Sequence, residues 1–186
     1  MLAQPSNSAD TLSLEAYRGY LCALAHANWN RQLQGKFDVA DIVQQALLKA
    51  HAALPGLRDR SPGGLVAWLR QILTAELIDA QRHFHCEKRD IAREHSLAAD
   101  VDQSAAGLEN WLAADQTSPS LAAARNEQLL RLADAIDKLP ADQREVVILK
   151  HLRELPLQQI AAETGRTPAS VAGLLRRGLA RLRELL

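Results

Sequence analysis

The 186-residue chain has few aromatic residues, few cysteines and no net charge. Aromatic residues make up 4% of a sequence that is 47% hydrophobic, so its core must be built from aliphatic side chains. Cys22 and Cys86 are too few for a disulfide framework. Because 22 basic and 22 acidic residues cancel, no overall field draws the chain to nucleic acid. Any such binding must come from a local concentration of charge.

Several other features are also missing from the sequence. No apolar run approaches the roughly 18 residues of a membrane span, and there is no signal peptide. Alternating β-branched runs are absent while Leu and Ala dominate, so we predict an all-α, cytoplasmic protein without membrane insertion. There is no Gly-rich phosphate loop, nucleophile elbow or carboxylate pair. We therefore predict that the chain is not an enzyme and binds no cofactor.

The clearest motif is a helix–turn–helix near the C-terminus. A short apolar-faced helix should end at Gly165, a residue that tolerates the left-handed conformation. Thr167 offers an N-cap hydroxyl, and Pro168 suits the first position of the next helix. The apolar stripe of that helix consists of Val171, Leu174, Leu175, Leu179, Leu182 and Leu186. From Arg166 onward the chain carries five arginines and a single acid, which predicts a helix that lies in a DNA groove.

The same basic helix has two simpler interpretations. It could be a solvated helix packed on its own domain, or a helix lying on a membrane surface. The short preceding helix and the Gly-Arg-Thr-Pro turn favour DNA. The predicted DNA-binding residues here are Arg166, Thr167, Ser170, Gly173, Arg176 and Arg177.

Changes in periodicity divide the chain into two helical domains. A polar leader, 1–12, precedes a helical domain at 13–95, with helices over about 14–33, from Asp38, and over about 65–93. Ile42, Leu47, Leu48 and Leu54 should form the apolar side of the second of these helices. Residues 96–122 lose their periodicity, and 96–124 contain four acids and no Lys or Arg, so we predict a flexible acidic linker. Residues 123–186 then form a second domain of four helices.

Three stretches resemble bacterial RNA polymerase sigma factors. D-V-A-D-I-V-Q-Q-A-L-L-K-A at 38–50 resembles the family's D-x-x-D-L-V-Q-E-T-F-L-R-A. W-L-x-x-I at 68–72, continuing to I-D-x-x-R at 78–82, resembles the segment that follows it. L-P-A-D-Q-R-E-V-V at 139–147 resembles the opening of region 4. The order and spacing are those of the small extracytoplasmic-function group.

This resemblance implies a function and a set of site residues. Such proteins bind core RNA polymerase and direct initiation at specific promoters, region 2 reading the −10 element and region 4 the −35 element. The implied polymerase-binding residues are Asp41, Gln44, Gln45 and Lys49. The implied −10 residues, in the loop at 57–64 and the helix after it, are Arg58, Arg60, Ser61 and Arg70. Whether an anti-sigma factor, a kinase or control of expression restrains the chain stays open.

The sequence departs from the family in the recognition helix. Ala172-Gly173-Leu174 replaces the usual Lys-Ser-Arg, so few side chains can reach base edges. Arg176 or Arg177 could bind guanine or a phosphate. Leu47 replaces a Phe and Ala75 an Asn in the first domain.

Three other interpretations of the sequence are possible beside the sigma-factor interpretation. His83, His85, Cys86 and His95 could bind zinc, but we expect exposed helical residues and no metal. The chain could also be a dimeric DNA-binding regulator, which would leave the 41–50 helix without a role. A protein-binding adaptor is the third alternative, favoured by the neutral charge and the depleted recognition face.

Overall fold

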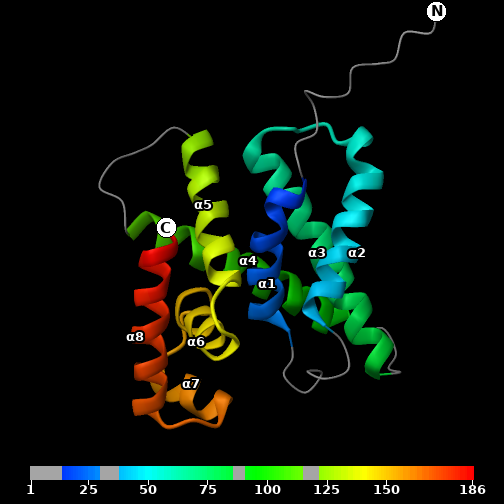
Figure 1. The fold of residues 1–186 in the computed structure, drawn as a ribbon. Helices are drawn as coiled ribbons and strands as arrows, with labels where there is room; N and C mark the ends of the chain where they lie inside the picture. The colour runs from blue at the N-terminus through cyan, green and yellow to red at the C-terminus, as the bar shows by residue number, and fades with distance from the viewer. Residues whose placement is uncertain (1–13, 30–37, 86–90, 115–121) are drawn as a thin grey trace, which may run out of the picture.

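The protein is all-α, as predicted, over the residues that the structure describes (Figure 1). The structure is a computed structural model that describes residues 14–29, 38–85, 91–114 and 122–186; at 83–85, 91–95, 114 and 122–123 it describes the backbone alone. These residues form eight α-helices and two short 3₁₀ helices, without a strand. None of the described helices combines the length and apolar character needed to cross a bilayer.

Helix α1 (Arg18–Asn28) lies at the centre of the molecule and follows a 3₁₀ turn, η1 (Leu14–Tyr17). It contacts α2, α3, α4, α5 and α6. Nearly every side chain from Gly19 to Asn28 is buried, because the helix is apolar on all sides and its alanines let neighbours approach closely. Neighbouring helices therefore surround α1.

Helices α2 (Val39–Ala53) and α3 (Pro62–His85) pack on one side of α1, joined through the 3₁₀ turn η3 (Leu54–Gly56). Asp38 caps α2 as predicted, accepting a hydrogen bond from the backbone N–H of Ala40 at 3.0 Å. Leu48 was predicted on the apolar side of α2, and this is wrong: its side chain is 56% exposed. The buried side consists of Val39, Ile42, Val43, Ala46, Leu47 and Ala50.

Helix α4 (Ile91–Ala114) replaces most of the predicted flexible linker. The prediction is wrong for residues 96–114, and residues 91–93, predicted to end the preceding helix, also belong to α4. Its buried side chains recur at helical spacing: Leu97, Val101, Ser104, Ala105, Leu108 and Leu112. Because α4 contacts α1, α3, α5 and α6, tertiary packing stabilises a helix whose short Ala and Ser side chains gave a weak periodic signal.

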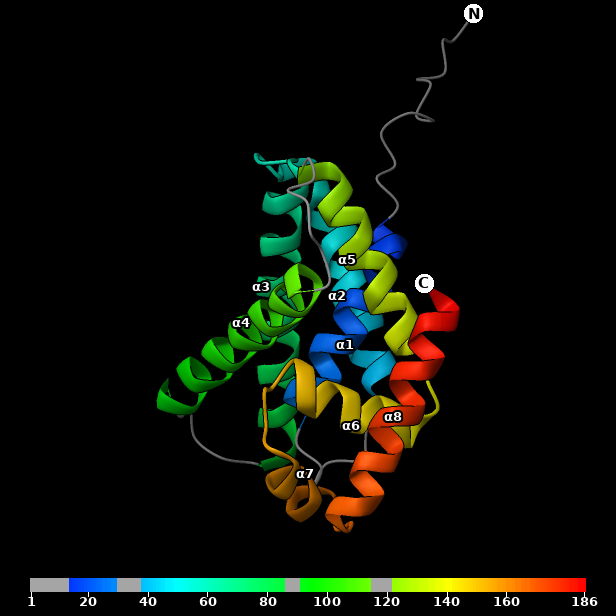
Figure 2. The same ribbon diagram turned by 90° about the vertical axis from the view of Figure 1, so that its left-hand side faces the viewer.

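The four predicted C-terminal helices are confirmed as α5 (Ala122–Asp137), α6 (Ala141–His151), α7 (Leu157–Thr164) and α8 (Pro168–Leu185). Helix α8 packs on α5, α6 and α7 (Figure 2). Its buried side chains match the predicted stripe at Val171, Leu174, Leu175 and Leu182, whereas Leu179 is partly buried and Leu186 is 61% exposed. Gly178, which the sequence did not assign to this stripe, is also buried.

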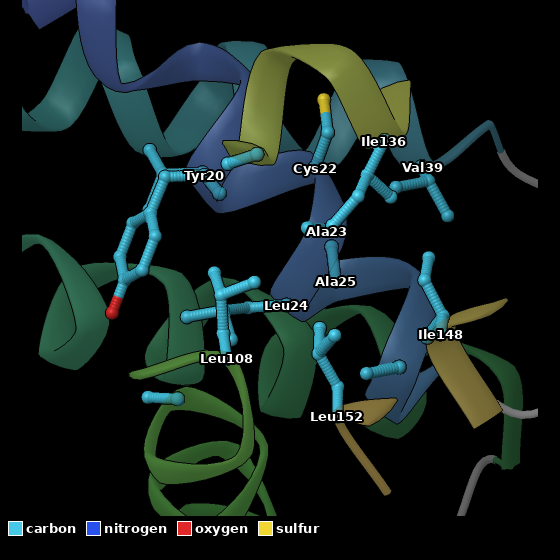
Figure 3. Close-up of a cluster of buried hydrophobic side chains, with 14 of the residues drawn as sticks. Tyr20, Cys22, Ala23, Leu24, Ala25, Val39, Leu108, Ile136, Ile148 and Leu152 are labelled. Carbon is cyan, nitrogen blue, oxygen red and sulfur yellow. The ribbon is translucent and has the colours of Figure 1, made fainter. Parts of the chain in front are cut away.

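One hydrophobic core joins the N-terminal and C-terminal helices. Figure 3 shows α1 side chains such as Leu24 surrounded by Leu108 of α4, Ile136 of α5 and Ile148 of α6. The division of the chain into 13–95, 96–122 and 123–186 stays a prediction. The arrangement described here packs the predicted domains directly against each other.

Candidate nucleic-acid interface

The turn between α7 and α8 has the geometry that the sequence predicts. Gly165 has a φ of 66°, and its N–H bonds back to the carbonyls that end α7. The Thr167 hydroxyl accepts a hydrogen bond from the N–H of Ser170 at 3.2 Å, so it caps α8, and Pro168 occupies the first turn. These local bonds fix the start of α8 relative to α7.

Arg166 holds this turn against α6. Its guanidinium donates to the carboxylates of Glu145 and Asp142, each at 2.6 Å, and its side chain is 22% exposed. A guanidinium with two carboxylate partners has few donors left for a phosphate. We therefore treat Arg166 as a residue that positions the recognition helix.

The outward face of α8, opposite its apolar stripe, is open and basic. Its exposed residues are Ala169, Ser170, Ala172, Arg176, Arg177 and Ala180, with Gly173 partly covered. Apart from the two arginines this face carries only short side chains. A Cβ added at Gly173 would meet only the Arg177 guanidinium, at 3.5 Å, so the middle of the face leaves room for another chain to approach closely.

The loop at 57–64 has more internal order than its sequence suggested. Asp59 accepts a hydrogen bond from the N–H of Ser61 at 2.9 Å, and the bonds from Ser61 lower the pKa of this exposed carboxyl. The Ser61 hydroxyl accepts from the N–H of Gly64 at 3.1 Å, so Ser61 caps α3. Arg58 and Arg60 are exposed beside it. The loop thus presents two arginines from a rigid turn that also carries one acid.

Arg70 of α3 lies away from that loop, among groups from α1 and α4. Its Nε is 3.5 Å from Asp102 and its NH1 is 3.9 Å from Glu109, and its side chain is 23% exposed. Burial raises the pKa of the neighbouring Tyr20 to about 12, although Arg70 opposes the rise. Of the four predicted −10 residues, Arg70 is therefore the one covered by the rest of the chain.

Helix α2 presents a separate exposed face. Asp41, Gln44 and Gln45 are exposed on it, and Leu48 continues the same row, because residues three, four and seven apart share one side of a helix. Lys49 lies at its edge, and its ammonium bonds to the nearly buried Glu76 of α3, which raises the pKa of Lys49. The structure therefore brings together three predicted polymerase-binding residues, adds Leu48, and gives Lys49 a partner of its own.

The side chains of His83, His85, Cys86 and His95, for which we expect no metal, lie outside the described residues. Among the side chains that are described, no group of three or more His, Cys, Asp or Glu residues could hold a metal ion.

Sequence reasoning missed three features of these surfaces. The Ser61-Pro62 pair is a typical start of a helix and could have shown that Ser61 is a cap. The spacing from Asp41 to Leu48 could have placed Leu48 on the polar face. The pairing of Arg70 with Asp102 and Glu109 had no local signal, because it joins helices whose packing the sequence did not predict.

Comparison with known proteins gives consistent results. A family model described as Sigma-70, region 4, matches residues 129–182. The chain is similar to the extracytoplasmic-function sigma factor SigD of Mycobacterium tuberculosis, with 29% identity over 92% of this chain and 74% of SigD. It is 26% identical to the RNA polymerase sigma-E factor of Streptomyces avermitilis, over 79% of this chain and 70% of that protein.

A solved structure also matches. It is the sigma factor RpoE in complex with the anti-sigma factor NepR, from Bartonella quintana, with 22% identity, 92% of each chain covered and a TM-score of 0.34. The family model covers the helix–turn–helix and its open basic face, and the SigD match extends over most of the chain. The chain is therefore similar to the extracytoplasmic-function RNA polymerase sigma factors over most of its length, and its four C-terminal helices contain the match to sigma-70 region 4.

Proposed function

We propose that this chain is a sigma factor that binds core RNA polymerase in the cytoplasm and directs it to promoters through two DNA-binding surfaces. The observation that carries the proposal is the open basic face of α8, set on a capped helix–turn–helix inside the segment that matches region 4. Sigma factors act in transcription initiation and are not enzymes, as predicted from the sequence. The catalysed reaction is then carried out by the polymerase.

The −35 element is assigned to α8. Arg176 and Arg177 are exposed, and each could donate two hydrogen bonds to a guanine or bind a phosphate. The short side chains around them let the helix lie deep in the groove but offer few contacts to bases. This surface should therefore bind duplex DNA with modest affinity that falls steeply with salt. Promoter specificity then depends on the two DNA-binding surfaces acting together.

The −10 element is assigned to the loop at 57–64 and the start of α3. Arg58 and Arg60 are exposed there and can hold phosphates of melted DNA. Ser61 fixes the loop through its cap, so it contributes shape. The loop has no aromatic side chain on which a base could stack, so a base must be recognised by backbone groups and a shaped surface.

We assign the binding of core polymerase to the exposed face of α2. Asp41, Gln44 and Gln45 supply polar contacts, and Leu48 supplies an apolar one in the same row. A large side chain that is 56% exposed gains more from burial against a partner than a solvated Gln does. Within this surface we therefore expect Leu48 to contribute the most binding energy.

Binding to purified core RNA polymerase tests the proposal. Gln44→Ala combined with Leu48→Ala should weaken binding at least tenfold, because the few residues that dominate an interface cost about 2 kcal/mol or more each when truncated. Gln103→Ala, on an exposed site of α4, is the matched control and should bind like the unmodified chain.

Each result has a distinct meaning. Failure of the unmodified chain to bind core polymerase would contradict the proposal and favour a dimeric DNA-binding regulator. Binding without promoter-dependent transcripts would favour the adaptor. Unchanged binding of the double variant would remove the polymerase surface from α2.

A further inference from the structure

The start of α8 is tied to α6 through side chains and to α7 through the backbone (Figures 1 and 2). The guanidinium of Arg166 donates to Glu145 through NH1 and to Asp142 through NH2, each at 2.6 Å. The backbone N–H of Arg166 bonds to the carbonyl of Ala161 on α7 at 3.0 Å. The next residue, Thr167, caps α8. Arg166 therefore links three helices, and its side chain forms one ion-pair network with Asp142 and Glu145, the Arg166 network.

The Arg166 network is partly covered, which distinguishes it from an ordinary surface ion pair. The side chains of Arg166 and Glu145 are 22% and 23% exposed, whereas that of Asp142 is 69% exposed. Isolated surface pairs contribute little, because solvent and salt screen them and two long side chains must be ordered. A planar guanidinium that reaches two carboxylates through short charge-assisted bonds is held in one geometry. The network can therefore fix the angle between α6 and the start of α8.

A second contact holds the middle of α8 on α6. A Cβ at Gly178 would lie 2.9 Å from the Val147 side chain, so the two helices are in close contact there. From Gly178 back to Thr167, α8 extends about 16 Å, at about 1.5 Å per residue. A tilt of about 10° at Gly178 would move the start of α8 by about 3 Å, close to the roughly 3.4 Å between base pairs. Without the network, α8 could therefore shift by about one base pair.

The charge of the network does not favour DNA. Two carboxylates and one guanidinium leave one negative charge in excess beside the turn. Arg176 and Arg177 are exposed on the same helix and supply the attraction for phosphates. The N-terminal residues of a recognition helix are the ones that contact base edges. A group that orients this end of α8 therefore controls which base pairs are read.

We propose that the Arg166 network positions α8 for sequence recognition. Asp142 and Glu145 hold Arg166, Arg166 fixes the first turn of α8, and the network acts on DNA only through that helix. The proposal rests on the function proposed above, in which α8 reads the −35 element. The network then determines which base pairs are read, and Arg176 and Arg177 supply affinity.

Fluorescence anisotropy with the full-length chain and two duplexes tests the proposal. One duplex is selected by the unmodified chain from a random library, and the other is a mixed-sequence pool of the same length. The ratio of the two affinities measures selectivity. Glu145→Gln takes a partner from Arg166 and adds one positive charge, so an Arg166 that binds phosphate would then bind both duplexes more tightly. A positioning network predicts instead that the ratio falls at least about fivefold, the cost of one mismatched base pair, without weaker binding to the pool.

Two further variants separate geometry from charge. Arg166→Lys keeps the charge, but an ammonium cannot bridge two carboxylates as a planar guanidinium does, so the ratio should fall as in Glu145→Gln. Glu163→Gln is the matched control. It removes the same charge from an exposed site on α7, where Gln159 of the same helix donates to it at 3.1 Å. Its ratio should stay within about twofold of the unmodified chain, because such a charge affects all sequences alike.

Hydrogen exchange tests the network without DNA. The N–H groups of Ser170 and Val171 bond to the hydroxyl and the carbonyl of Thr167, at 3.2 and 3.0 Å. If Arg166 fixes this turn, both groups should exchange at least about threefold faster in Glu145→Gln and in the Lys variant, whereas the N–H of Leu182 should not change. This measurement does not depend on whether α8 binds the −35 element. It therefore separates failure of this proposal from failure of the proposed function.

Two results would overturn the proposal. One is a Glu145→Gln chain whose affinity for both duplexes changes by the same factor, because a phosphate contact acts on every sequence alike. The other is unchanged exchange at the start of α8 in both variants. Asp142→Asn, at the most exposed member of the network, should lower the ratio by a smaller factor and gives the answer if Glu145→Gln does not fold. An unmodified chain that selects no duplex would contradict the proposed function, and exchange would then decide on the network alone.

Discussion

Helices α4 and α8 are both amphipathic, and the chain uses them in opposite ways. The outward face of α8 is basic and open to solvent, and its apolar side packs on its own C-terminal helices. The outward face of α4 is acidic, and its apolar side contacts helices from both predicted domains. Helix α8 presents basic side chains to solvent, whereas α4 places acidic side chains beside Arg70 of α3.

This contrast shows that a charged side chain becomes a binding group only where the packing leaves it free. Arg70 and Arg176 were both predicted to bind DNA. Arg176 is exposed, whereas Arg70 lies between two carboxylates. The residue type is the same, and the difference comes from which helix packs beside it.

The largest expected effect comes from truncating the buried side of α4. Leu108 is fully buried, so Leu108→Ala should lower the free energy of unfolding by about 2–5 kcal/mol, as large-to-small core changes do. Urea denaturation measures this. Asn110→Ala, an exposed change on the same helix, should stay within about 0.5 kcal/mol of the unmodified chain. Equal stability of the two variants would contradict the packing of α4 and favour the flexible linker predicted from the sequence.

Acid should weaken the packing around α1 through His26. Burial, with a smaller contribution from Arg144, lowers the pKa of His26 to about 4, against the opposing effect of Asp137 and Asp38. The folded chain therefore favours neutral His26, whose contribution is complete above the unfolded pKa of about 6.5 and is lost as the pH falls toward about 4. The loss should reach about 3 kcal/mol.

Urea denaturation at pH 7 and pH 4.5 measures this loss. His26→Gln cannot titrate in this range, so it should lose less stability than the unmodified chain over the same interval. Identical pH dependence of the two chains would show that other groups cause the acid sensitivity.

The open face of α8 should carry most of the affinity for duplex DNA. Arg176→Ala with Arg177→Ala should weaken binding tenfold to a hundredfold, since one such contact is worth about 1–3 kcal/mol, and should lower the salt slope by about two contacts. Fluorescence anisotropy at several salt concentrations measures both. Arg181→Ala is the control, because Arg181 pairs with Glu184 near the end of the helix. Full affinity in the double variant would contradict the assignment.

The two faces of α8 should respond oppositely to the same small change. A Cβ at Gly178 would lie 2.9 Å from the Val147 side chain on α6, so Gly178→Ala should destabilise the protein by about 1–3 kcal/mol. A Cβ at Gly173 would contact only the flexible Arg177 side chain. Because Ala has a higher helix propensity than Gly, Gly173→Ala should leave the stability unchanged or raise it by up to about 1 kcal/mol. Thermal unfolding distinguishes them, and the same sign for both would show that α8 packs differently.

Much of the fold could be predicted where the signal was local. Asp38, Thr167 and Gly165 mark helix ends through their own side chain or backbone, and the structure places a boundary at each. Helix α4 could not be predicted in this way, because its short side chains give little periodic contrast. Leu97 and Leu108 are buried only because α1 and its neighbours supply the other half of the contact.

The candidate site divides in the same manner. The open face of α8 followed from helical spacing, and its exposure agrees with that prediction. The roles of Arg166, Lys49 and Arg70 depend on partners that lie at least 21, 27 and 32 residues away in the sequence, respectively, so no local pattern could reveal them. Long-range ion pairs therefore separate residues that position a surface from residues that form it.

The most direct test is transcription with purified core RNA polymerase and this chain on fragments of its own genome. We predict a stable complex and transcripts that start at defined sites only when the chain is present, and that are lost in the Arg176→Ala and Arg177→Ala double variant. A complex that yields no chain-dependent transcripts, or no complex at all, would contradict a role in promoter-specific initiation.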